Sequence, residues 1–223
     1  MKRKLEYALV GIFLVILLIA GSRLYQIWEG YHTADKEYEK LQELAELPDA
    51  GPDHGLPDKP KGQSEEPGID FESLRQINPD IVAWIKIEAA GIDYPVVQGE
   101  DNEHYLHYTF LGEANIAGSI FLDYRNKADL SDDKIILYGH NMRDGSMFAA
   151  LKNLEVEEAP IAVLYTPEET LQYQLSGENY VSPVNEIYQL EISAANRNKR
   201  TLILSTCSND GSSRHVFVGK LLG

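Results

Sequence analysis

Residues 201–207 read Thr-Leu-Ile-Leu-Ser-Thr-Cys, a short apolar run that ends at the only cysteine of the chain. Leucine and β-branched side chains in such a run predict a buried strand. One cysteine cannot form an internal disulfide, so Cys207 is either a buried apolar thiol or a reactive one. Arg214 follows seven residues later, at the start of another strand-like run.

A second run of the same kind ends in a histidine, because residues 134–140 read Lys-Ile-Ile-Leu-Tyr-Gly-His. A thiol, an imidazole and a guanidinium at the edges of strands can form the active site of a nucleophilic enzyme. Each of the three residues also has a purely structural interpretation. Cys207 could pack as an apolar thiol, His140 could cap a strand end, and Arg214 could form a surface salt bridge. The spacing alone leaves both interpretations open.

The composition is that of a globular protein and argues against a nucleic-acid partner. Of 223 residues, 43% are hydrophobic and 25% are charged, which leaves room for one domain of about 150 residues plus appendages. The formal net charge of −15 disfavours nucleic acid, because phosphate binding requires clustered lysine and arginine. The single cysteine also excludes a disulfide framework.

The N-terminus has the pattern of a membrane anchor. Lysine and arginine at positions 2–4 precede an unbroken apolar stretch over residues 7–21. A helix over this stretch spans only about 22 Å of the ~30 Å hydrocarbon, but residues 24–28 include the aromatic side chains that settle in the interface. We therefore predict a retained single-pass anchor over residues 1–28, with a cytoplasmic N-terminus and the rest of the chain outside the cell. A cleaved signal peptide, with a weak site at residues 20–22, is the alternative.

Residues 29–68 are predicted to connect the anchor to the folded domain. Over residues 32–47 charged side chains alternate with Tyr38, Leu41, Leu44 and Leu47, a pattern that fits a short amphipathic helix. A solvated stalk is the favoured interpretation of this stretch. Residues 48–68 hold five of the ten prolines together with glycine and charged residues, and are expected to form a flexible or semi-extended tether.

Residues 69–223 are predicted to form one domain of the mostly-β class. Asp70 is placed to cap a short helix that ends at Ile77, and a second helix is expected over residues 147–154. Eight short runs rich in β-branched and aromatic residues, within about 155 residues, favour a closed or nearly closed β-barrel. The runs are residues 81–87, 93–98, 118–123, 134–138, 161–165, 171–175, 201–206 and 215–222.

The segments around His140, Cys207 and Arg214 resemble the catalytic segments of sortases, which are membrane-anchored cysteine transpeptidases of Gram-positive bacteria. The class B branch is the most similar. Supporting similarity extends the resemblance from about residue 69 to residue 222. The matching stretches are Tyr138-Gly139-His140-Asn141-Met142, Leu204-Ser205-Thr206-Cys207, Arg214 before Val216-Phe217-Val218, and residues 78–85, 93–99, 118–126 and 144–148.

The resemblance implies a sortase-like eight-stranded barrel and gives three residues catalytic roles. Cys207 would be the nucleophile that forms a thioacyl-enzyme. His140 would protonate the leaving amine and then deprotonate the incoming one. Arg214 would bind the oxyanion or the peptide carbonyl, because its fixed fork of donors suits that task.

The resemblance also suggests residues that bind the substrate peptide. Residues 102–106 read Asn-Glu-His-Tyr-Leu and match an Asn-x-x-x-Leu segment that lines the groove in class B sortases. Asn102 and Leu106 are therefore candidates. Ser205 and Thr206 stand beside the proposed nucleophile and are expected to hydrogen-bond the substrate.

The implied function is that of a transpeptidase at the cell membrane. It would cleave the C-terminal sorting signal of a secreted protein and transfer that protein to an amine, either of the cell-wall precursor or of a pilin lysine. No cofactor is implied, and His104 and His107 lack the third ligand that a metal site would need. The connection over residues 167–200 is shorter than in typical class B sortases and reads partly as strand at 172–175 and 187–192, which leaves the sorting motif open.

Two other functions remain open from the sequence. L,D-transpeptidases also place a histidine before a cysteine and an arginine in a β-rich exported domain. They carry a Ser-x-Gly-Cys signature, however, whereas this chain has Ser205-Thr206-Cys207. The non-enzymatic alternative is an exported binding or pilus-assembly module in which Cys207 is an inert, buried thiol.

Overall fold

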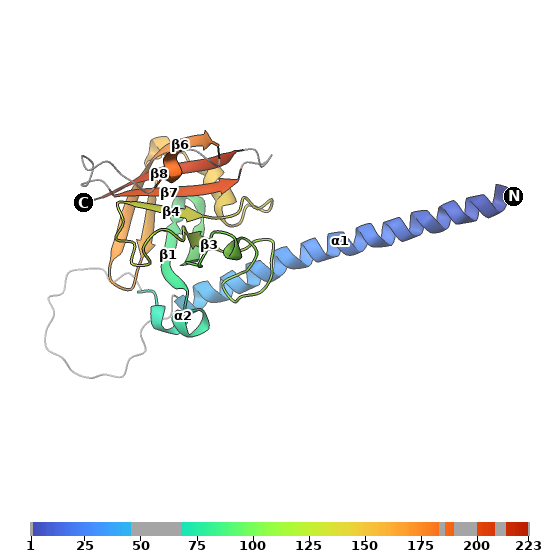
Figure 1. Cartoon of the computed structure of the whole chain (residues 1–223), viewed down its shortest axis with the longest axis horizontal. Helices are drawn as coiled ribbons and strands as arrows, with labels where there is room; N and C mark the ends of the chain where they lie inside the picture. Colours follow the sequence, from blue (N-terminus) through green and yellow to red (C-terminus); the bar gives the residue numbers. More distant parts are fainter. Residues whose placement is uncertain (1, 46–67, 183–185, 190–199, 208–212, 223) are drawn as a thin grey trace.

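Eight strands close into a barrel in the computed structural model of the chain, which describes residues 2–45, 68–182, 186–189, 200–207 and 213–222. Around the barrel the strands follow the order β1-β2-β3-β4-β7-β8-β6-β5 (Figure 1). This closure confirms the predicted mostly-β barrel. The strands are β1 (Ile81–Ile87), β2 (Ile92–Val97), β3 (Ile120–Leu122), β4 (Lys134–Tyr138), β5 (Ile161–Tyr165), β6 (Thr170–Val181), β7 (Thr201–Cys207) and β8 (Arg214–Leu221).

The pairing of β4 with β7 is parallel, and it sets the position of the predicted active site. The two strands lie side by side in register from Lys134 opposite Thr201 to Tyr138 opposite Ser205. β8 pairs with the other edge of β7 in the antiparallel sense. Because parallel strands point the same way, β4 and β7 end at the same edge of the barrel.

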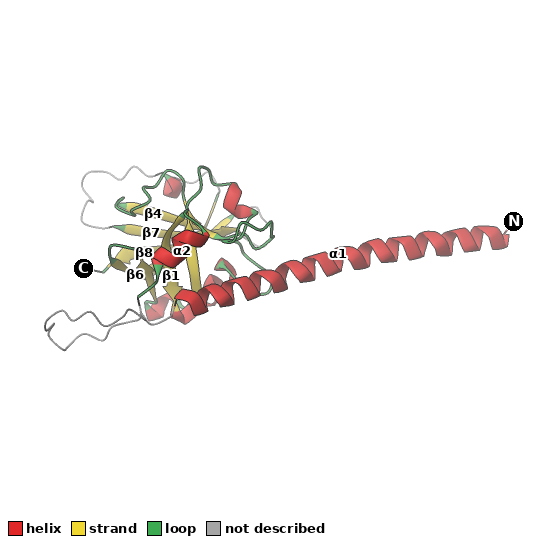
Figure 2. Cartoon of the chain, turned by 90° about the horizontal axis from the view of Figure 1, so that it is seen from below, coloured by secondary structure: helices red, strands yellow, loops and turns green. Residues whose placement is uncertain are grey.

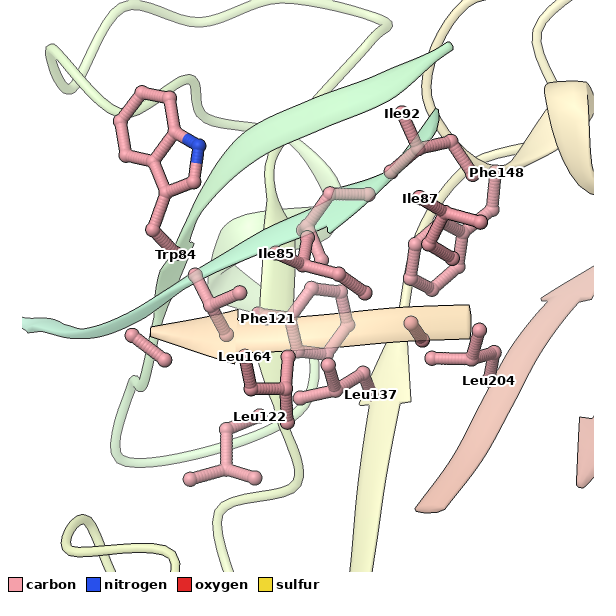
Figure 3. Packing of buried hydrophobic residues seen from close by; sticks show 14 of the residues in the cluster. Trp84, Ile85, Ile87, Ile92, Phe121, Leu122, Leu137, Phe148, Leu164 and Leu204 are labelled. Carbon is pink, nitrogen blue, oxygen red and sulfur yellow. The ribbon is translucent and has the colours of Figure 1, made fainter. Parts of the chain in front are cut away.

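The apolar runs of β4 and β7 are buried on both faces, which explains why they contain no polar alternation. Leu137 and Leu204 face inward and belong to the main core of the barrel. Figure 3 shows Leu137 close to Phe121 and Leu164 in this core. The alternate side chains Ile136 and Ile203 belong to a second cluster outside the barrel, whose other buried members are Val216 of β8 and Tyr188.

The segment that covers this outer cluster differs from the sequence prediction. η5 (Glu186–Tyr188) is a single 3₁₀ turn and residue 189 is irregular. The strand predicted over residues 187–192 is therefore wrong at residues 187–189, and residues 190–192 lie outside the described part of the chain. β6 is longer than predicted. Its pairing with β8 continues to Val181, opposite Arg214, because the β-bulge near Gly177 lets the two strands stay paired past the apolar stretch.

The short helices largely follow their sequence signals. α2 (Phe71–Ile77) begins after Asp70, whose carboxylate accepts a hydrogen bond of 3.0 Å from the backbone N–H of Ser73, as predicted for an N-cap. The helix predicted over residues 147–154 is the 3₁₀ helix η3 (Phe148–Asn153). The remaining 3₁₀ turns are η1 (Glu88–Ala90), η2 (His104–Leu106) and η4 (Val156–Glu158).

One continuous helix, α1 (Lys2–Ala45), carries both the predicted anchor and the start of the predicted connection. Figures 1 and 2 show it leaving the barrel as a long rod whose free end is the N-terminus. Within the described part of the chain, α1 is the helix that is long and apolar enough to cross a membrane. This is consistent with the predicted anchor, and its orientation across the membrane stays a prediction.

The last part of α1 packs on the barrel, so the expectation of a solvated stalk over residues 32–47 is corrected. The buried side chains of this part include Ala34, Tyr38, Leu41 and Ala45. The Tyr38 hydroxyl donates a hydrogen bond of 2.7 Å to the carbonyl of Gly118. The apolar positions at threefold spacing therefore do mark an amphipathic helix, but its partner surface is the distant β2–β3 region. The tether predicted over residues 48–68 lies almost wholly outside the described residues.

Gly118 is the position at which this region tolerates no side chain. Its φ is +54°, and an added Cβ would lie 2.5 Å from the carbonyl oxygen of Tyr105. Gly112 has a similar φ of +80°, but open space surrounds the position where its Cβ would be. Both positions require the left-handed backbone that favours glycine, and only Gly118 adds a backbone collision.

We predict that Gly118→Ala lowers the free energy of unfolding by at least about 2 kcal/mol more than the matched control Gly112→Ala, which carries only the strain of positive φ, roughly 1 kcal/mol. Thermal unfolding of the detergent-solubilised full chain measures both variants. Equal melting temperatures for the two variants would contradict the close packing at Gly118.

Candidate active site

The three predicted catalytic residues are brought to one edge of the barrel by strand register. Tyr138 lies opposite Ser205 in the parallel pair, and His140 and Cys207 each stand two residues further along. Cys207 pairs in turn with Arg214, the first residue of β8. Residues more than 60 positions apart in the sequence thus meet at the ends of three adjacent strands.

A pocket of about 320 Å³ opens at this edge. Six of the seven predicted site residues line it, and the seventh, Cys207, follows Thr206 at the end of β7. The side chain of Cys207 lies outside the described part of the structure. The lining residues are Asn102, Glu103, Leu106, Phe121, Arg125, Tyr138, Gly139, His140, Tyr188, Ser205, Thr206 and Arg214.

Gly139 lets the chain pass the core immediately before His140. An added Cβ at this position would lie 2.5 Å from Ile120 Cδ1 and 2.8 Å from the ring of Phe148. The Gly139 N–H donates to the carbonyl of Ser205 at 3.2 Å and so extends the ladder between β4 and β7 by one bond. The histidine is therefore delivered to the pocket by a backbone that is fixed on both sides.

The imidazole of His140 is oriented by a backbone carbonyl. Its Nε2 lies 2.7 Å from the carbonyl oxygen of Leu106. Because a carbonyl can only accept, Nε2 carries the proton, and in the neutral ring Nδ1 carries the lone pair. Burial lowers the pKa of His140, and the positive charges of His107 and Arg214 lower it further, against the opposing effect of the Leu106 hydrogen bond. A neutral histidine of defined tautomer can act as a general base.

A buried carboxylate, which the sequence analysis did not single out, links several residues of the pocket lining. Asp123 is fully buried, and the guanidinium of Arg125 donates two hydrogen bonds to it, of 2.8 and 2.7 Å. The hydroxyl of Tyr138 donates to the same carboxylate at 2.9 Å, and the side-chain amide of Asn102 donates at 3.2 Å. Asp123 therefore joins three residues that line the pocket but come from different segments.

The same network fixes the charge of Asp123 and the position of η5. Burial raises the pKa of Asp123, but the hydrogen bonds from Arg125 and Tyr138 outweigh it, so the pKa lies below its ordinary value. Arg125 also donates to the carbonyl of Tyr188 at 3.1 Å. The only sequence signal for this network was the Asp-Tyr-Arg-Asn stretch of residues 123–126, which entered as family similarity without a role.

The hydroxyl groups before Cys207 have different environments. Ser205 Oγ lies 2.9 Å from the hydroxyl of Tyr188, and Ser205 is buried. Thr206 Oγ1 is also buried and has no hydrogen-bond partner among the residues that the structure describes. Such a group is costly to bury unless something else satisfies it. This is consistent with the predicted substrate-binding role of Thr206, which stays a prediction.

The remaining histidines of interest lie away from the pocket. His104 stacks on Tyr108 with ring centroids 4.6 Å apart. His215 is buried and stacks on Tyr180 at 4.3 Å. Neither ring lines the pocket described above.

Comparison with known proteins shows which family this chain is similar to. The family model described as "Sortase domain" matches residues 85–222. Sortase B of Staphylococcus aureus is 36% identical over 154 residues, which cover 69% of this chain and 59% of that protein. Sortase B of Listeria monocytogenes is 38% identical over 120 residues, or 54% of this chain and 47% of that protein. The chain thus matches between about half and three fifths of these relatives' length.

Solved structures of similar proteins share the fold. Sortase B of Bacillus anthracis, in complex with AAEK1, has a TM-score of 0.69 at 29% identity and covers 88% of this chain and 99% of that one. Sortase B of Clostridium perfringens has a TM-score of 0.61 at 32% identity over 68% and 99%. A class B sortase involved in pilus biogenesis in Streptococcus pyogenes has a TM-score of 0.59 at 29% identity over 69% and 98%.

Replacing Asp123 tests whether the buried carboxylate organises the pocket. We predict that Asp123→Asn lowers the free energy of unfolding by about 2–3 kcal/mol, less than for a fully buried pair because Arg125 is 38% exposed. Asp129→Asn, at an exposed carboxylate, is the matched control and should change little. Urea unfolding in detergent measures both, and equal stabilities would show that the carboxylate is dispensable.

The direction of the pKa shift of His140 can be measured. We predict that an NMR titration places the His140 pKa below 6.5. Because the unfolded chain then binds the proton more tightly, the contribution of His140 to stability is present above pH 6.5 and is lost as the pH falls through the folded-state pKa. His140→Gln should make the stability curve flatter below pH 6.5, where the wild-type protein loses this contribution. A measured pKa at or above the ordinary value would refute this.

Proposed function

Because the chain belongs to the sortase family, with class B sortases among its relatives, we propose that it is a membrane-anchored cysteine transpeptidase with Cys207 as its nucleophile. The observation that carries this proposal is the register of β4, β7 and β8, which brings His140, Cys207 and Arg214 to one barrel edge beside a pocket. The family assignment favours a sortase over an L,D-transpeptidase.

In the proposed reaction, the proton of the Cys207 thiol passes to His140 and the thiolate attacks the carbonyl carbon of the scissile peptide bond. Arg214 stabilises the negative charge that develops on the carbonyl oxygen. The C–N bond then breaks, His140 donates its proton to the departing amine, and a thioester remains on Cys207. An acceptor amine attacks the thioester, His140 takes up the released proton, and the thiolate is restored.

The lowered pKa of His140 suits this order of proton transfers. A ring that is neutral at rest can accept the thiol proton, and the proton it holds during the reaction is readily given to the leaving amine. The hydrogen bond from Nε2 to the Leu106 carbonyl leaves Nδ1 as the atom that exchanges this proton.

The proposed substrate is a secreted protein that bears a C-terminal sorting signal. Asn102, Leu106, Ser205 and Thr206 line the pocket and are the proposed contacts for the peptide. One of the structural relatives, Sortase B of S. aureus, has been solved as a substrate complex. The proposed acceptor is the amine of a cell-wall precursor or a lysine of a pilin, and the pilus-associated relative in S. pyogenes keeps the second choice open.

The proposed location is the cell membrane. The apolar part of α1 would span the bilayer once, and the basic residues at positions 2–4 would stay in the cytoplasm. The barrel would then lie outside the cell, where secreted proteins and their acceptors meet.

Peptide cleavage by the full chain tests the proposal. We predict that a library of sorting-signal peptides is cleaved, that an added amine diverts the product from acid to amide, and that Cys207→Ala abolishes both reactions without lowering the melting temperature. His104→Gln, at an exposed residue that does not line the pocket, is the matched control and should retain cleavage. Substantial turnover by Cys207→Ala, or no thiol labelling of the parent protein, would favour the inert binding module.

A further inference from the structure

The two parts of α1 belong to one unbroken helix, so the membrane anchor and the barrel have a fixed relation. Over residues 9–28 the large apolar side chains are exposed, with Leu18 at 71% and Trp28 at 59%. From Ala34 to Ala45 the side chains that face the barrel are buried. A helix without a break transmits its direction from one part to the other.

The length of the helix locates the outer surface of the bilayer along α1. About 20 residues cross the hydrocarbon, and four or five more cross the headgroup region. Counted from the basic residues at positions 2–4, this places the outer surface near residue 30. Tyr25 and Trp28, whose ring centroids lie 6.0 Å apart, then fall in the interface, where aromatic rings are most stable.

A loop of the barrel lies against α1 at this level. Residues 107–117, here called the β2–β3 loop, connect η2 to β3. The side chain of Asn115 donates a hydrogen bond of 2.9 Å to the carbonyl of Gly30. The neighbouring side chain of Ile116 also lies beside Gly30, since a Cβ added at Gly30 would be 3.8 Å from Ile116 Cγ1. Ile116 is nevertheless 48% exposed. An apolar side chain thus projects at the calculated height of the membrane surface.

The candidate active site lies at the same end of the barrel. Figures 1 and 2 both show the C-terminus at the end of the barrel away from the free end of α1. β8 ends there, so its first residue, Arg214, and the end of β7 lie at the end that faces the anchor.

Contacts of the loop that follows His140 agree with this placement. A pocket of about 230 Å³ between α1 and the barrel is lined by Asp35, Tyr38, Ser146 and Met147, among others. The pKa of Asp35 is raised mainly by burial and next by the negative charge of Asp144, which lies nearby. Asp35 is five residues past Gly30, or about 8 Å along the helix axis.

We propose that the outer leaflet of the phospholipid bilayer is a binding surface for this barrel: the β2–β3 loop, through Ile116, rests among the lipid headgroups and holds the candidate active site toward the membrane. The contact is coupled to the site through the chain itself, since η2 precedes the loop and its Leu106 carbonyl holds the His140 ring. One consequence, which rests on the proposed function, is that donor peptide and acceptor amine would enter the pocket along the membrane surface.

Accessibility of single spin labels measures this contact directly. The full chain with Cys207→Ala, which removes the native thiol, receives either Ile116→Cys or Glu168→Cys and is reconstituted into phosphatidylcholine nanodiscs. Glu168 is the matched control and lies in an exposed turn. The next residue of this turn, Glu169, forms an ion pair of 3.3 Å with Arg200, which immediately precedes β7. That turn therefore lies at the opposite end of the barrel from Cys207.

We expect the label at residue 116 to collide several-fold more with oxygen dissolved in lipid, and several-fold less with a water-soluble nickel chelate, than the label at residue 168. Equal accessibility at the two positions would overturn the proposal, and so would loss of the chain from the discs. The measurement requires no catalysis, so its failure is distinct from failure of the peptide-cleavage assay.

Discussion

The parallel register between β4 and β7 is the constraint on which both the core and the candidate site depend. Side chains alternate along each strand, so a slip of one residue would exchange Leu137 and Leu204 with Ile136 and Ile203. The inward set would then face outward. The same slip would turn His140 away from the end of β7. Such a slip would cost the burial of a whole layer of apolar side chains on each face of the strands. The packing of the core therefore also fixes the geometry of the site.

A second organising element is the ion pair of Asp123 and Arg125, which the barrel could replace with apolar residues if stability were the only requirement. A carboxylate with 0% exposure is costly to desolvate, and it is compensated here by donors from three segments. The contribution of the ion pair is to fix the orientation of the groups around it. Asn102, Tyr138 and the η5 backbone are each held by a directional hydrogen bond instead of by packing alone.

The sequence predicted the strands well because short β-branched runs between turn signals report local preference directly, as in β1, β4 and β5. It located His140 and Arg214 because each ends or begins such a run. It could not show where the amphipathic part of α1 would pack, since Tyr38 and its partner Gly118 are 80 residues apart. The Asp123 network was missed for the same reason: apart from Arg125, its donors Asn102 and Tyr138 lie in segments that only the closed barrel brings together.

An unbroken helix between bilayer and barrel also acts as a ruler. In the proposed membrane placement, the stretch of α1 from Gly30 to Asp35, with a rise of 1.5 Å per residue, leaves less than about 10 Å between the lipid surface and the loop after His140. An extended chain covers about 3.3–3.6 Å per residue, so roughly three residues of a peptide bridge that gap. Four residues inserted into α1 between Trp28 and Tyr31 would lengthen this distance by about 6 Å, which is about the span of two further extended residues.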